Sequence, residues 1–348
     1  MAVRPRDGPI GAILREPAER GARRIALTHL AKAREARDRL DDPGNASSLH
    51  DFRVSLRHLR SWLRAFRPVL RDTVSAKVER RLERIATATG ASRDLEVHID
   101  WVVRARRTLT DRGRGGAAWL LRRLRASKRE ADAELRAAID RDFERATLRA
   151  EEGLQRYEAR VADDGPRFGD VAADLIVRHA VELEQAMSRV STQGDRAEAH
   201  AARIAAKRLR YLAEGVADAA PEAQALVDEL KRLQDTLGEL HDAQLFGSEL
   251  STRIAELLAD RTAAGKPSTG PNANGRPDPV NGLRVLLRRL RRAEATSFAS
   301  FQATWGGGVA VAAFTERVGV IERCLREGAT RVDAVDTLPA RRRGRPRQ

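Results

Sequence analysis

The chain has 348 residues, of which 42% are hydrophobic and only 4% aromatic, and 65 Lys and Arg residues stand against 50 acidic ones. Ala and Leu supply much of the apolar fraction, which favours helices over sheets, and the length favours two structural units. The single cysteine, Cys324, excludes an internal disulfide and predicts a reducing, cytoplasmic compartment. No apolar run approaches the roughly 18 residues of a membrane span, so we expect no membrane partner.

Prolines and glycines divide the chain into stretches with helical apolar spacing. Residues 1–9 are predicted to be a flexible N-terminus and residues 10–155 a first helical-bundle repeat. Residues 166–330 are predicted to form a second repeat, interrupted by a mobile Pro-, Gly- and Asn-rich loop at 265–282. Residues 331–348 form an Arg-rich tail that we expect to be disordered. Removing the five arginines of the tail still leaves a net charge of +10 from the total of +15, so the helical body is itself basic.

The first repeat contains a strongly amphipathic helix that begins near His50. Because each helical residue advances about 100°, five basic residues fall within an arc of roughly 80°. These are His50, Arg53, Arg57, Arg60 and Arg64. The neighbouring apolar stripe consists of Phe52, Leu56, Leu59, Leu63 and Phe66. Stacked like charges cost a helix roughly 0.2–0.5 kcal/mol per pair, so the pattern favours an external anion. Pairing with acidic residues on neighbouring helices is the alternative.

The same pattern recurs 150 residues later as His200-x-x-Arg203-x-x-x-Lys207-x-x-Arg210. Its apolar stripe consists of Ala202, Ala206, Leu209, Leu212 and Val216. In each repeat another histidine, His29 or His179, precedes the first motif histidine by 21 residues. The repetition of this basic stripe predicts that the protein binds a polyanion, such as nucleic acid, anionic lipid or polyphosphate.

Two more landmarks recur in the same order. Gly90-x-x-Arg93-Asp94 corresponds to Gly238-x-x-His241-Asp242, and the segment Leu-Leu-Arg-Arg-Leu-Arg occurs at 120–125 and at 286–291. The chain is therefore predicted to be an internal duplication, all-α, with a pair of four-helix bundles related by pseudo-two-fold symmetry. The two aspartates follow glycines that we expect to break helices, so they are predicted to cap a helix or to hold a nearby arginine.

On the segments His50-Asp-Phe-Arg-Val-Ser-Leu-Arg-His-Leu-Arg60 and His200-Ala-Ala-Arg-Ile-Ala-Ala-Lys-Arg-Leu-Arg-Tyr211, the chain resembles the CHAD family, the conserved histidine α-helical domain. The segments 90–97 and 230–242 are similar to the family as well, so the resemblance covers nearly the whole chain. The resemblance implies that the two repeats form one CHAD domain around a basic groove or pore. No Glu-x-Glu-x-Lys signature of the triphosphate-tunnel domain is present, so we expect a stand-alone copy.

The resemblance also implies non-enzymatic binding of inorganic polyphosphate and residence on polyphosphate granules in the cytoplasm of prokaryotic cells. By the family's pattern, the binding role falls first on the two basic stripes. The resemblance assigns other basic residues, including Arg122, Arg123, Arg288 and Arg289, to polyphosphate binding less directly. The polyphosphate-binding candidates are His50, Arg53, Arg57, Arg60, Arg64, His200, Arg203, Lys207, Arg208, Arg210, Arg122, Arg123, Arg288, Arg289, His29 and His179.

A nucleic-acid-binding protein is the alternative function. The tail residues Arg343, Gly344, Arg345 and Pro346 are similar to the core of an AT-hook, which enters the minor groove of DNA. A disordered basic tail that raises the affinity for any polyanion is the simpler interpretation of the same residues.

An enzyme is not favoured by the sequence. There is no Walker-type glycine loop, no His spacing for a metal and no repeated carboxylate pair to hold magnesium, so we expect no catalytic residues, metal or cofactor. Neighbouring arginines should keep His50 and His200 neutral, whereas a bound polyanion would favour their protonation. Binding is therefore expected to strengthen as the pH falls.

Overall fold

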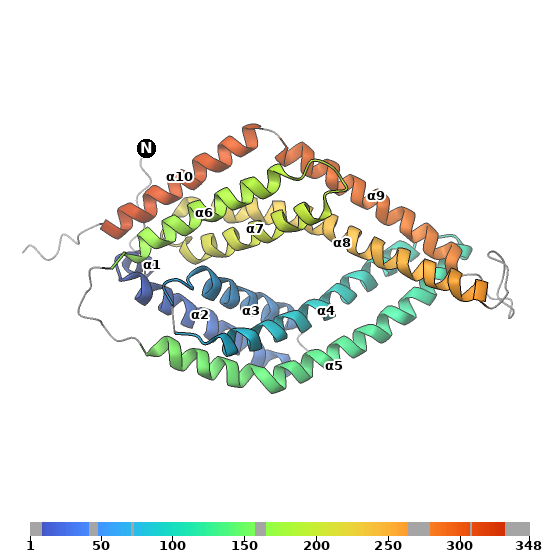
Figure 1. Cartoon of the computed structure of the whole chain (residues 1–348), viewed down its shortest axis with the longest axis horizontal. Helices are drawn as coiled ribbons and strands as arrows, with labels where there is room; N and C mark the ends of the chain where they lie inside the picture. The colour runs from blue at the N-terminus through green and yellow to red at the C-terminus, as the bar shows by residue number, and fades with distance from the viewer. Residues whose placement is uncertain are drawn as a thin grey trace, which may run out of the picture.

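The computed structural model describes residues 9–41, 48–70, 73–156, 165–263, 279–306 and 308–330. Within these ranges it contains ten α-helices, one short 3-10 helix and no β-strand beyond an isolated bridge between Pro17 and Arg167 (Figure 1). None of the described helices is long and apolar enough to cross a membrane. The prediction of an all-α fold is confirmed. In chain order the helices are α1 (Pro9–Ile13), α2 (Ala18–Asp38), the 3-10 helix η1 (Arg39–Asp41), α3 (Ser48–Ala65), α4 (Ala76–Arg106), α5 (Asp111–Gln155), α6 (Phe168–Ser188), α7 (Arg196–Val216), α8 (Pro221–Ala263), α9 (Pro279–Trp305) and α10 (Gly308–Thr330).

Both predicted apolar stripes are buried. On α3 and just after its end, Phe52, Leu59 and Phe66 have no exposed surface. On α7, Ala202, Ala206 and Leu209 are equally inaccessible, and the remaining members of both stripes are at most 4% exposed. The hydrophobic periodicity therefore orients the two helices correctly, because burying one face leaves the basic face turned away from the core.

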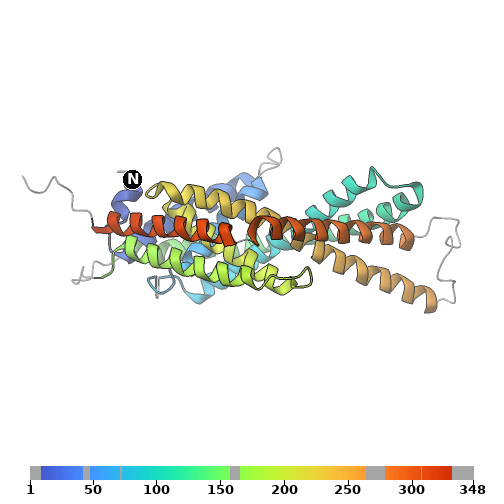
Figure 2. The ribbon, with the colours of Figure 1, turned by 90° about the horizontal axis from the view of Figure 1, so that it is seen from above.

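The helices surround two apolar cores. The larger core takes side chains from both halves of the chain, and Phe66 stacks between Trp62 and Phe168 with ring centroids 4.4 and 5.5 Å apart. The smaller core lies where the α4–α5 hairpin meets the α8–α9 hairpin, at the right of Figure 1. Figure 2 shows α9 and α10 in line along the long axis, so α9 spans from one core towards the other.

The two halves touch through backbone at both ends of the molecule. At the start of α2 and α6, Ala18 donates its backbone N–H to the carbonyl of Pro166 (3.0 Å), and Phe168 donates to Glu16 (2.9 Å). In the smaller core, a Cβ added at Gly116 of α5 would lie 2.6 Å from the Cα of Gly282 in α9. Only glycine permits so close an approach of two helices.

Three local predictions need correction. The glycines Gly90 and Gly238 do not break helices, because α4 and α8 continue through them, supported by packing over most of their length. Asp94 and Asp242 consequently lie inside helices and do not cap them. The predicted loop at 265–282 ends too late, since residues 279–282 form the first turn of α9, where Pro279 lacks the N–H that would be unpaired anyway. Residues 264–278 lie outside the described part of the chain.

At the ends of the chain, the first helix begins at Pro9, within the predicted N-terminal segment. Residues 1–8 and 331–348 lie outside the described residues, so the structure does not bear on their predicted flexibility. The AT-hook-like core at 343–346 belongs to the second of these segments.

Candidate anion-binding site

The helices α3 and α7 pack against each other in the middle of the molecule (Figure 1). Their basic faces meet there, because Arg57 of α3 acts on the pKa of Arg203 and Lys207 of α7. Burial lowers the pKa of both Arg203 and Lys207, and the nearby charge of Arg57 lowers both further. Arg57 likewise lowers the pKa of Arg53 on its own helix. We call Arg53, Arg57, Arg203 and Lys207 the central cluster.

Within the described part of the chain, the central cluster has no counter-ion at contact distance. Its four side chains are half-buried, yet none forms an ion pair with any residue of the described ranges. The Nε of Arg203 is buried without a hydrogen-bond partner there. A half-buried cation without a partner loses hydration and gains nothing in exchange, so an external anion is the natural complement of this cluster.

Two members of the central cluster have lowered pKa values, so their charged forms are disfavoured in the free protein. Burial, followed by the charges of Arg203 and Arg57, lowers the pKa of Lys207 to about 7. Burial, followed by Arg57 and Arg93, lowers the pKa of Arg53 to about 10. The protein therefore maintains this concentration of positive charge at a cost, which is typical of a binding site.

Two carboxylates moderate the cluster from a distance. Asp242 and Asp94 both act to raise the pKa of Arg203, although burial still lowers it overall. Burial raises the pKa of Asp242 itself, and the charge of Asp94 raises it further. These aspartates therefore act on Arg203 through their charge, and neither forms an ion pair with a described residue.

An open cavity of about 220 Å³ continues from the central cluster between α3, α6 and α7. We call it the α3–α6–α7 cavity. Arg57 and Arg60 line it at the cluster side, and Arg64, Arg178 and Arg208 line its exposed part. These three exposed arginines form no ion pair within the described ranges. The only carboxylate among the lining residues is Glu182, which lies 2.8 Å from Nδ1 of His179.

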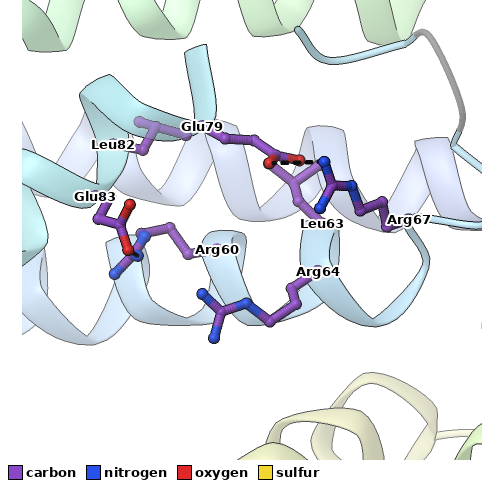
Figure 3. Close-up of a pocket in the computed structure, with 7 residues that line it drawn as sticks. All are labelled: Arg60, Leu63, Arg64, Arg67, Glu79, Leu82 and Glu83. Carbon is purple, nitrogen blue, oxygen red and sulfur yellow. Dashed lines mark hydrogen bonds and ion pairs between the residues drawn. The ribbon is translucent and has the colours of Figure 1, made fainter. Parts of the chain in front are cut away.

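On the flank of α3 that faces α4, two of the three arginines that line a second cavity are paired. Arg60 Nη2 lies 3.3 Å from Glu83 Oε1, and Arg67 Nη2 lies 3.9 Å from Glu79 Oε2, around a cavity of about 110 Å³. Figure 3 shows both pairs and shows Arg64 extending away from Glu79. Internal pairing, the alternative to an external anion, therefore applies to Arg60 but not to Arg64.

Arg210 is also paired internally. Its Nη1 lies 3.2 Å from Glu214 Oε1, and the other carboxylate oxygen lies 3.2 Å from Nε2 of His58. Burial lowers the pKa of His58 to about 3 and that of His29, whose ring is 5.6 Å away, to about 4. These histidines are therefore neutral at pH 7, and His29 lies among side chains that leave it little access to a ligand.

The other candidate histidines differ from one another. His50 is exposed, whereas His200 lies beside His241 with ring centroids 4.7 Å apart. Burial, then Arg203, lowers the pKa of both His200 and His241, the latter to about 4. Burial also lowers the pKa of His179. Among the described residues, no group of three or more His, Cys, Asp or Glu side chains is placed to hold a metal ion.

The structure places the distal arginines away from the central cluster, beside the smaller core. Arg289 donates to the backbone carbonyls of Ala105 (3.1 Å) and Thr108 (3.0 Å), and so satisfies the C-terminal end of α4. The guanidinium of Arg123 lies 4.9 Å from the ring centre of Trp119. Arg122 and Arg288 are exposed on the same two helices. These four line neither cavity described above.

Sequence reasoning missed Arg178. It immediately precedes His179, but the corresponding residue of the first repeat is Thr28, so no repeated motif drew attention to it. Only the packing of α6 against α7 brings it to the same cavity as Arg64 and Arg208.

The protein is thus an all-helical protein in which two similar cationic helices face each other. The chain belongs to the CHAD family, since the family model for the CHAD domain matches residues 24–251. Its fold is similar to that of the crystal structure of the CHAD domain from the plant Ricinus communis, with a TM-score of 0.54 and 18% sequence identity over 92% of this chain and 94% of that one. A comparison with curated proteins gives no match.

Proposed function

We propose that this protein binds inorganic polyphosphate at the central cluster and performs no chemistry on it. The observation that carries the proposal is that Arg53, Arg57, Arg203 and Lys207 converge from two helices without an internal counter-ion in the described structure. A line of cations binds a line of phosphates and releases the counterions that had condensed on it. Membership of the CHAD family supports the same assignment.

The shape of the site favours a thin, flexible anion over nucleic acid. The cluster side chains are half-buried between α3 and α7, where a duplex with grooves about 6 and 12 Å wide would have to approach edge-on. Single-stranded sites ordinarily add exposed aromatic platforms for base stacking. The α3–α6–α7 cavity has no aromatic ring among its lining residues apart from His179, which is buried.

We also propose that the chain is an internal duplication with a pseudo-two-fold axis and that the basic groove follows this axis. Ala18 donates to Pro166, and Phe168 donates to Glu16. Each donor lies 150 residues from the other donor, and each acceptor 150 residues from the other acceptor, so the two hydrogen bonds are equivalent. Gly116 and Gly282, each four residues before a Leu-Leu-Arg-Arg-Leu-Arg segment, contact each other. Contacts between equivalent residues are what a two-fold relation produces.

The cellular role follows from the ligand. We propose that binding recruits the protein to polyphosphate granules in the cytoplasm, and that the tail beyond Leu338 adds affinity for any polyanion, including DNA through Arg343 to Pro346. The candidates His50, His200, Arg60 and Arg210 flank the central cluster and are proposed to contribute less than its four members, because Arg60 and Arg210 already have acidic partners.

The test is a titration of long-chain polyphosphate and of duplex DNA at about 0.15 M salt, where screening limits simple charge attraction. The intact chain is compared with one that ends at Leu338. We expect both proteins to bind polyphosphate and only the intact one to bind DNA measurably. Equal or stronger binding of DNA by the truncated protein would overturn the assignment in favour of a nucleic-acid-binding body.

A second expected result concerns pH. In the free protein the pKa of Lys207 is about 7, because of burial and the charges of Arg203 and Arg57. Bound phosphates stabilise the protonated amine and raise its pKa, so the complex takes up protons above about pH 7. The affinity should therefore fall as the pH rises from 7 to 9, with a slope approaching one decade per unit.

This result is measured by fluorescence anisotropy of labelled long-chain polyphosphate, in which the few terminal phosphates contribute little titration. The matched control is Lys207→Arg, which stays charged throughout and should give a flatter profile. Identical profiles for the two proteins would show that Lys207 is not the titrating contact.

A further inference from the structure

Two crevices flank the pair of helices α3 and α7, and they are built from equivalent positions of the two repeats. The first is the α3–α6–α7 cavity. The second lies between α2, α3 and α7, around the side chains that enclose Glu214. Equivalent residues of the two crevices are 150 positions apart in the sequence.

Size decides which crevice is open. Ser61 lines the α3–α6–α7 cavity, and the residue equivalent to it is Tyr211. Tyr211 is 5% exposed, and its ring lies 4.5 Å from that of His58, while the guanidinium of Arg210 lies 4.8 Å above it. A serine leaves free volume where the tyrosine fills it, so the first crevice is a cavity and the second is packed.

Charge differs in the same sense. The open crevice carries Arg64, Arg178 and Arg208, none of which has an ion pair in the described ranges. Their equivalents in the packed crevice are Glu214, Thr28 and His58. There Glu214 contacts Arg210 and the neutral His58. The equivalent of Glu182 is Lys32, which is exposed near His58 and forms no ion pair within the described ranges. The packed side therefore offers a phosphate one unpaired cation from these equivalent positions, against three on the open side.

We infer that a bound polyphosphate leaves the central cluster on one side only, through the α3–α6–α7 cavity, where Arg64, Arg178 and Arg208 form a further phosphate-binding subsite. The inference rests on the proposed function. Arg57 belongs to both the central cluster and the lining of the cavity, so the two sets of cations are continuous. A chain that occupied the cluster would be drawn towards the three free arginines, whereas the buried ring of Tyr211 fills the equivalent space on the other side.

The test compares three variants in the full chain. Arg178→Ala combined with Arg208→Ala removes two exposed contacts, and Arg129→Ala combined with Arg189→Ala removes two exposed charges outside both cavities. Ser61→Tyr copies the residue of the packed crevice into the open one. Each is titrated with long-chain polyphosphate and with tripolyphosphate, over a range of salt concentrations, after thermal unfolding has shown that it folds.

The subsite variant should lose roughly tenfold or more in long-chain affinity, and its salt slope should fall by about 1.5, whereas the surface variant should change little. Ser61→Tyr should weaken the long chain more than tripolyphosphate, because the short anion fits in the central cluster alone. Failure of the wild-type protein to bind either anion would refute the proposed function itself. Normal wild-type binding, with the subsite variant equal to the surface variant and Ser61→Tyr unaffected, would overturn the one-sided exit and leave the function standing.

Discussion

Replacing Arg57 by Glu should reduce the affinity for long-chain polyphosphate about a thousandfold at 0.15 M salt. The substitution removes a charged contact and places a carboxylate beside the phosphates, and like charges in contact cost several kcal/mol. Arg57 is the residue through which the central cluster joins the α3–α6–α7 cavity. Of the four members of the central cluster, Arg57 is the one that lines this cavity.

The same substitution should raise stability. In the free protein Arg57 lowers the pKa of Arg53, Arg203 and Lys207, after burial, so its charge is unfavourable to all three. A glutamate in its place would attract them, and we expect the free energy of unfolding to rise by about 1 kcal/mol. Binding and stability therefore move in opposite directions, which a purely structural role for Arg57 would not produce.

Titration with polyphosphate and urea unfolding of the free protein provide the two measurements. Arg129→Glu makes the same change in net charge on an exposed part of α5 and serves as the matched control. A large loss of affinity accompanied by a large loss of stability would indicate that Arg57 holds the fold together, and the proposed site would then be wrong.

Gly116→Ala should lower the free energy of unfolding by about 3 kcal/mol, although alanine is intrinsically the better helix former by about 1 kcal/mol. The added Cβ would lie 2.6 Å from the Cα of Gly282 and 2.7 Å from the carbonyl oxygen of Pro279. These are backbone atoms, which can yield only if α5 and α9 separate. That separation would loosen the smaller core between the two hairpins.

Gly90→Ala is the matched control. Gly90 lies in the middle of α4, and nothing is within 4 Å of a Cβ added there. This substitution should raise the free energy of unfolding by about 0.5–1 kcal/mol through helix propensity alone. Thermal or urea unfolding of both variants measures the difference, and equal stabilities would show that α5 and α9 do not make the close contact.

The competition between internal pairing and an external anion is resolved residue by residue. Arg60 and Arg210, one on each basic stripe, have acidic partners at 3.3 and 3.2 Å. Arg53, Arg57, Arg203 and Lys207 have none among the described residues. Helical spacing places all of these cations on one face of each helix and puts Glu214 one turn after Arg210. It could not show that Arg60 pairs with Glu83, because that partner comes from α4.

The corrected predictions have a similar origin. Gly90 and Gly238 were expected to end helices on local propensity, yet burial of long apolar faces outweighs the cost of about 1 kcal/mol for a glycine in a helix. Asp94 and Asp242 consequently contribute through their electrostatic influence on Arg203 and not as caps. Arg289, assigned to polyphosphate by resemblance, donates to carbonyls at the end of α4, and its contact with polyphosphate stays a prediction.

The amino-acid sequence by itself determined the helical class, the two amphipathic helices and the faces they bury, since these depend on the spacing of residues along one helix. The repeated motifs also indicated the family and the class of ligand. Only the tertiary structure decided that the two basic faces meet, that Arg178 joins Arg64 and Arg208, and that Tyr211 packs one crevice while Ser61 leaves the other open. These features depend on which helices lie next to each other, and that is set by the packing of side chains far apart in the chain.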